Sequence, residues 1–114
     1  MYTELTIGNK TYKLRLTTKG AIQLEKGLGR NPVSMLMEID EGKLPTLSDV
    51  LITFHAMLQP FNHGVSMDEV YDIYDAFIAD GKTMFDLIPV FVDVFKESGF
   101  IAKNTGNVED NEKN

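Results

Sequence analysis

Residues 12–32 read YKLRLTTKGAIQLEKGLGRNP, and this stretch decides the fold. From Tyr12 to Leu16, apolar and polar side chains alternate, which is the period of a β-strand with one buried face. The hydroxyl of Thr17 or Thr18 can then cap a short amphipathic helix, because it can accept from the unpartnered N–H groups of the first turn. Gly27 and Gly29 end this helix. We therefore expect a strand followed directly by a helix, and neither carries catalytic chemistry.

A first strand precedes this stretch, because Leu5 and Ile7 alternate with polar residues in the same way. Residues 8–11 form a loop between the two alternating runs. We therefore expect a β-hairpin over residues 2–16, and its apolar face must pack on helices because an isolated hairpin is marginal in water. The expected cross-strand pairs are Ile7 with Tyr12 and Leu5 with Leu14.

Further helices are predicted after residue 30 from their start signals. Asn31 followed by Pro32 is a cap residue and a first-turn proline. Ser66 and Glu69 form a capping box, in which each side chain accepts from the backbone of the other residue. The expected helices span about residues 18–27, 32–40, 47–59, 67–80 and 86–98. The fourth is expected to bury Met67, Val70, Tyr74, Phe77 and Ile78.

These elements predict an α+β fold that is mostly α, with the N-terminal hairpin packed on four to five helices. Residues 1–102 are expected to form one globular domain, since their number suits a single core. Residues 103–114 are polar and rich in asparagine. We expect them to be a disordered tail, because they cannot bury enough apolar surface to offset the entropy of ordering.

Composition excludes several classes of protein. The chain of 114 residues has a formal net charge of −6, and its basic residues are scattered, so we expect no nucleic-acid partner. It contains no cysteine, which excludes disulfides, thiolate metal sites and cysteine nucleophiles. No apolar stretch is long enough to cross a bilayer, so no membrane association is expected.

No residue pattern predicts catalysis, a cofactor or a metal. His55 and His63 lack the further ligands that a metal site needs at helical or loop spacing. Asp68, Asp72 and Asp75 share one face of the fourth helix, and we interpret them as a solvated face or a docking face for a basic partner. We therefore expect a protein that binds and is not an enzyme.

The last helix is unusually apolar. Pro89 favours a start at Asp86, or after a single loose turn, because a proline in the first helical turn removes no hydrogen bond. A helix with so narrow a polar stripe is either central in the core or covered by a partner. Both alternatives remain open from the sequence. Our hypothesis is that Phe91, Val94 and Phe95 contribute to an oligomer or partner contact.

Residues 12–101 resemble the tail assembly chaperones of siphophages that infect Gram-positive hosts. The resemblance rests on the order and spacing of short motifs: Leu14–Thr18, Leu24–Lys26, Leu28–Pro32, the apolar helix of residues 47–58, Tyr71–Asp75 leading to Gly81, and Glu97–Phe100. No functional residue is fixed well enough in that family to be carried over to a position here.

The resemblance implies a non-enzymatic assembly factor, in its short form. Such proteins coat the tape measure protein, keep it soluble and recruit tail tube subunits. They work in the host bacterial cytoplasm and are absent from the mature virion. The family often makes a longer product by a programmed frameshift, and the tail after Lys103 would suit a linker at that junction. A homo-oligomer is a further expectation.

Three alternatives stay open beside this reading. The first is another phage interaction module, such as a head–tail or tube adaptor. The second is a small DNA-binding regulator, against which the absence of Lys and Arg between Asp68 and Asp80 argues. The third is an enzyme, for which the sequence supplies no nucleophile–base pair, metal set or cofactor motif.

Overall fold

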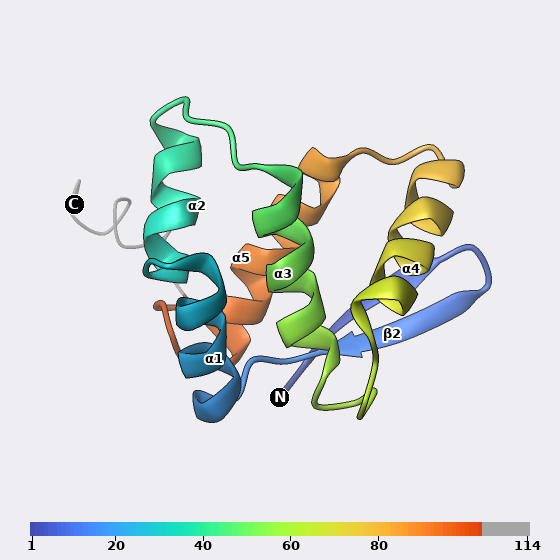
Figure 1. Cartoon of the computed structure of the whole chain (residues 1–114), viewed down its shortest axis with the longest axis horizontal. Helices are drawn as coiled ribbons and strands as arrows, with labels where there is room; N and C mark the ends of the chain where they lie inside the picture. Colours follow the sequence, from blue (N-terminus) through green and yellow to red (C-terminus); the bar gives the residue numbers. More distant parts are fainter. Residues whose placement is uncertain (104–114) are drawn as a thin grey trace, which may run out of the picture.

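The computed structural model describes residues 1–103, which form an N-terminal hairpin followed by helices (Figure 1). The predicted α+β class is confirmed, and most helix boundaries lie within a residue of the expected ones. The predicted disordered tail falls outside the described residues, apart from Lys103. The elements are β1 (Thr3–Ile7), β2 (Lys10–Leu14), α1 (Thr18–Leu28), α2 (Pro32–Asp40), α3 (Leu47–Leu58), α4 (Met67–Ala79), the 3₁₀ turn η1 (Met84–Asp86) and α5 (Leu87–Glu97).

The strand register differs from the predicted one by two residues. Strands β1 and β2 are antiparallel, and Leu5 lies opposite Tyr12, not opposite Leu14 as expected. The reason is the turn: only Gly8 and Asn9 connect the strands, so Lys10 and Thr11 already belong to β2. A shift of two residues returns each side chain to its original face, so the apolar face of the hairpin is the predicted one.

This turn gives the first testable prediction. Gly8 has a φ of +61°, and a Cβ added there would meet no atom within 4 Å. Gly8→Ala should therefore destabilise the chain through backbone conformation alone, by about 1–2 kcal/mol. Urea unfolding would measure this loss, with Asn9→Ala as the matched control because Asn9 does not have a positive φ. Equal losses of unfolding free energy in the two variants would contradict a positive φ at Gly8 as the cause.

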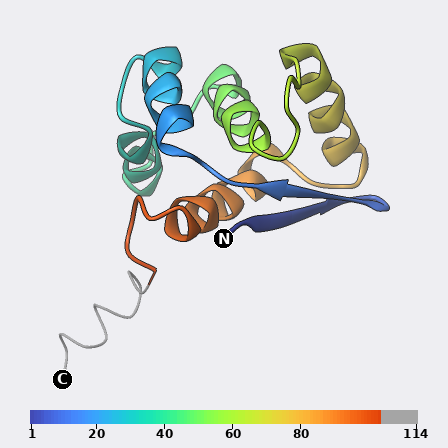
Figure 2. The same cartoon turned by 90° about the horizontal axis from the view of Figure 1, so that it is seen from below.

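The helices and the hairpin form two layers, which Figure 2 shows clearly. Helices α1, α3 and α4 lie side by side in one layer, while α5 and the hairpin form the other. The core lies between the layers and contains the fully buried rings of Phe54, Phe91 and Phe95. The rings of Phe54 on α3 and Phe91 on α5 are 6.4 Å apart between centroids. Aromatic burial thus joins the two layers.

Polar contacts fix the chain ends to this core. The Thr3 hydroxyl donates to the Asp93 carboxylate over 2.8 Å, and the Leu16 N–H donates to the Ser98 hydroxyl over 3.0 Å. Both bonds join the hairpin region to α5. They satisfy polar groups that would otherwise be costly at the edge of an apolar core.

Helix α5 begins after a single loose turn, as predicted from the position of Pro89. The turn η1 precedes it, and α5 starts at Leu87, which places Pro89 in the first turn. Thr83 and Asp86 form a capping box at the start of η1, with the Thr83 N–H donating to the Asp86 carboxylate over 2.7 Å. The loose turn before the helix therefore has its own hydrogen bonds, and the proline disturbs no helical bond.

Candidate protein-binding cleft between helices α3 and α4

The three residues predicted to contact a partner lie inside the core. Phe91, Val94 and Phe95 each have 0% of their surface exposed. Strand β1 packs against α5, where Thr3 donates to Asp93, and the Phe54 ring of α3 lies against the Phe91 ring. Burial within the monomer is therefore the alternative that the structure shows. None of the three side chains is exposed in the chain as folded, and their predicted role in an oligomer or partner contact stays a prediction.

The structure instead leaves an apolar cleft open between α3 and α4. Figure 1 shows these two helices diverging from the loop that joins them. The cleft has a volume of about 560 Å³. Its lining residues are apolar or aromatic except for one serine and one aspartate: Leu47, Ser48, Leu51, Ile52, Met67, Tyr71, Tyr74 and Asp75.

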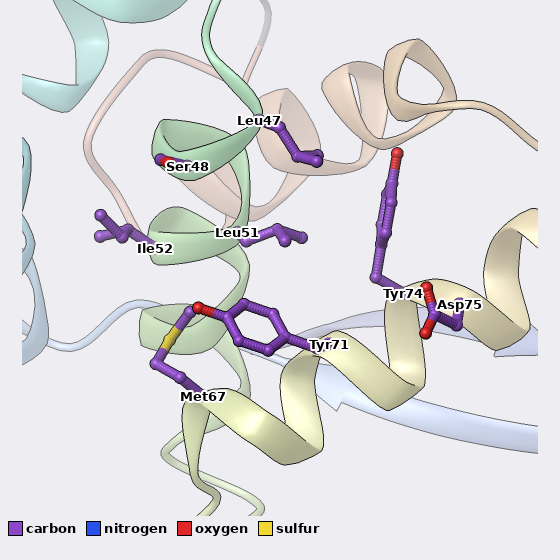
Figure 3. Close-up of a pocket in the computed structure, with 8 residues that line it drawn as sticks. All are labelled: Leu47, Ser48, Leu51, Ile52, Met67, Tyr71, Tyr74 and Asp75. Carbon is purple, nitrogen blue, oxygen red and sulfur yellow. The ribbon is translucent and has the colours of Figure 1, made fainter.

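Some of the lining side chains face each other across the cleft, while Ile52 points from α3 away from α4 (Figure 3). Figure 3 shows Leu47 and Leu51 pointing from α3 toward α4, and Tyr71 reaching from α4 toward α3. Leu51 is almost fully buried and lies deep in the cleft, whereas Leu47 is 46% exposed and Tyr71 is 47% exposed. The cleft is therefore a trough whose rims are open to water, not an enclosed cavity.

The attachment of α4 explains why the cleft stays open. On this helix only Val70 and Phe77 are buried, and they form one row that packs into the core. Met67 and Tyr74, which were predicted to be buried, are only partly so, and Ile78 is 40% exposed. The prediction failed because α4 is held to the core along a single row. Its apolar residues extend beyond that row onto the cleft side.

Local hydrogen bonds tie the loop between α3 and α4 to the adjoining helix ends. The His55 ring lies 2.7 Å from the carbonyl oxygen of Val65, and the Asn62 side chain donates to the Leu58 carbonyl over 3.0 Å. At the start of α4, the Ser66 hydroxyl accepts from the Glu69 N–H over 3.1 Å. The loop between α3 and α4 is thus tied to both helix ends, and His55 is part of this scaffold.

The α4 side of the cleft is acidic. Asp75 lines the cleft, and Asp68 and Asp72 are exposed on the same helix, which contains no lysine or arginine. Within residues 1–103 none of the three forms an ion pair. By contrast, Asp49 of α3 pairs with Arg30 over 3.3 Å. Asp75 in the cleft and Asp68 on the exposed side of α4 therefore remain available to a cationic partner, whereas Asp72 lines a separate hollow that also includes Lys10.

One carboxylate of α4 has a purely structural role. Glu69 accepts from the Ser66 N–H over 2.9 Å, and this hydrogen bond lowers the pKa of the Glu69 carboxyl. Its charge also lies in the first helical turn, where the helix dipole favours it. Glu69 therefore stabilises the start of α4 and lies outside the lining of the cleft.

Three further kinds of feature in the described residues bear on function: metal-binding clusters, a second groove and membrane-spanning helices. Among residues 1–103, no group of three or more His, Asp or Glu side chains is placed to hold a metal ion. A second apolar groove of about 380 Å³ lies between α2 and α5, and Met37 and Ile88 are among its lining residues. In the same part of the chain, no helix is long and apolar enough to cross a membrane.

Residues 2–113 match the model of one protein family, which is described as a family of unknown function (DUF6096). The chain belongs to this family. The match covers almost the whole DUF6096 chain, including both helices of the cleft. Neither the curated proteins nor the solved structures gave a match to it. The description of this family states no activity or partner.

Proposed function

We propose that this chain is a phage tail assembly chaperone, which works by binding and not by catalysis. Its partners would be the tape measure protein, which it would keep soluble, and the tail tube protein, which it would recruit. Two independent lines support the proposal: the resemblance over residues 12–101, and the open cleft between α3 and α4. The cleft is the main structural observation in favour of a binding function.

Keeping this apolar cleft open to water costs the folded chain free energy. Exposed apolar side chains gathered in one hollow are unfavourable in water, and such patches mark interaction sites. Met67 adds an adaptable side chain to the rigid ring of Tyr71, a pairing that suits partners of varied sequence. A cleft bounded by two helices is also the shape that accepts a third helix. A long helical tape measure protein would present many such segments.

The proposed setting follows from the proposed partners. The chaperone would act in the host bacterial cytoplasm, where tails are assembled, and would leave before the virion is complete. Homo-oligomerisation along a long partner would be compatible with this role. It would bring many clefts to one tape measure molecule and raise the effective affinity without new contacts.

Co-expression tests the proposal. The chain should be produced together with the tape measure protein encoded downstream of its gene, and the soluble fraction purified and sized. We expect a soluble complex, and an insoluble tape measure protein when the chain is omitted. A tape measure protein that stays insoluble with this chain, and also with any longer frameshift product, would overturn the proposal. Binding to a tube or connector protein alone would favour the adaptor function instead.

A further inference from the structure

We propose that the α3–α4 cleft binds an amphipathic helix that carries lysine or arginine beside its apolar stripe. The inference deepens the proposed function, on which it rests, because it names the binding surface and the chemistry of the partner segment. It follows from the shape of the cleft, from its charge and from the placement of its apolar side chains.

The shape favours a protein segment over a small molecule. Small-molecule sites enclose most of their ligand, whereas the rims of this cleft at Leu47 and Tyr71 are nearly half exposed. The α4 wall runs from Met67 to Asp75. At 1.5 Å per residue, this wall is roughly 12 Å long, or about two helical turns. A helix laid in the trough would insert apolar side chains at i, i+3, i+4 and i+7 into it.

The charge favours a cationic partner. Asp75 lies in the wall beside Tyr74, and Asp68 lies one turn before Tyr71 on the exposed side of the same helix. The lining contains no basic side chain that would neutralise Asp75. A helix whose apolar stripe is flanked by Lys or Arg would place ammonium or guanidinium groups against these carboxylates. Such pairing adds specificity and speeds association.

The same charges argue against a second copy of this chain as the occupant. Two chains joined through their α4 helices would bring Asp68, Asp72 and Asp75 of one against the same acids of the other. Like charges at an interface cost binding free energy. Each chain also carries a formal net charge of −6, which adds a longer-range repulsion.

The first experiment compares two designed helical peptides of about three heptads, with leucine at the a and d positions. One peptide carries lysine at the flanking positions and the other carries glutamate. Fluorescence anisotropy with the full chain should show binding of the lysine peptide and binding at least about tenfold weaker for the glutamate peptide. The affinity for the lysine peptide should fall as salt is raised. Equal binding of both peptides would overturn the charge argument.

Matched variants then locate the site. Tyr71→Ser should weaken binding of the lysine peptide about tenfold, because it removes the aromatic ring that reaches from α4 into the cleft (Figure 3). Ile78→Ser is the control, since Ile78 is on the same helix and 40% exposed but does not line the cleft. Asp75→Lys should weaken binding by a similar factor. Its control is Glu25→Lys, which makes the same change in net charge on the exposed surface of α1.

The outcomes separate this inference from the proposed function. An equal loss of peptide affinity in a variant and its control would mean that the peptide does not bind specifically in the cleft. That result would overturn the cleft as the binding site. If the tape measure protein co-purifies equally well with Tyr71→Ser and Asp75→Lys, the chaperone function stands but another surface binds. If the variants reduce peptide binding and the tape measure protein never co-purifies, the cleft is supported as a binding site and the chaperone function is contradicted.

Discussion

Phe91→Ala is expected to destabilise the chain by about 3–5 kcal/mol, a large part of the stability of a domain of this size. The Phe91 ring has 0% of its surface exposed and packs against Phe54 between the two layers. Alanine would remove most of its buried apolar area and leave a cavity that a packed core closes only in part. Thermal unfolding followed by circular dichroism should show Tm falling by roughly 15 °C or more.

Phe85→Ala is the matched control for this measurement. It makes the same substitution two residues before the start of α5. Unlike Phe91, Phe85 is 48% exposed, in the turn η1. Its effect should stay within about 0.5 kcal/mol, as for most surface substitutions. Similar losses of stability in the two variants would contradict the burial of Phe91. They would favour its predicted role as a partner contact.

Val70→Asp should unfold the chain, whereas Tyr71→Asp at the next position should leave it folded. Val70 has 0% of its surface exposed, and a carboxylate there would be buried without a partner, at a cost of about 4 kcal/mol or more. Tyr71 is 47% exposed on the cleft rim, so its aspartate would stay hydrated. Urea unfolding and one-dimensional NMR spectra of both variants would measure the difference.

This pair of neighbours tests the orientation of α4 directly. Adjacent residues on a helix point about 100° apart, so Val70 can face the core while Tyr71 faces the cleft. A folded Val70→Asp variant together with an unfolded Tyr71→Asp variant would mean that α4 is rotated and that the cleft does not exist. The predicted result would leave Tyr71→Asp available as a folded protein with an altered cleft.

Local signals in the sequence were sufficient for the helix boundaries. Asn31 with Pro32, and Ser66 with Glu69, start their helices where predicted, because caps act over three residues and need no tertiary context. The hairpin register could not be fixed in the same way. A four-residue loop and a two-residue turn place the same side chains on the buried face, so the apolar pattern cannot distinguish them.

The candidate site was harder to predict because burial depends on which elements cover which faces. The apolar content of α5 was read correctly, but the sequence could not show that the hairpin and α3 would cover Phe91. Along α4 the apolar residues occupy more than one face. The predicted burial of Val70 and Phe77 is confirmed, but only the structure shows that Met67 and Tyr74 are not fully covered. A sequence signal that could have indicated the cleft is the placement of Tyr71 beside Val70, since the two side chains point about 100° apart and the apolar surface of the helix extends over both.

The hydrogen bond from Thr3 to Asp93 also has a consequence for synthesis of the chain. Its two residues are separated by 90 positions, and the bond from Leu16 to Ser98 spans 82. The first strand therefore completes its packing only against the last helix. A chain emerging from the ribosome can form α1 to α4 early, but its core stays open until α5 has been translated. Folding of this chain is thus completed after nearly all of residues 1–98 have been synthesised, and a product that stops before α5 would expose the core residues of both layers.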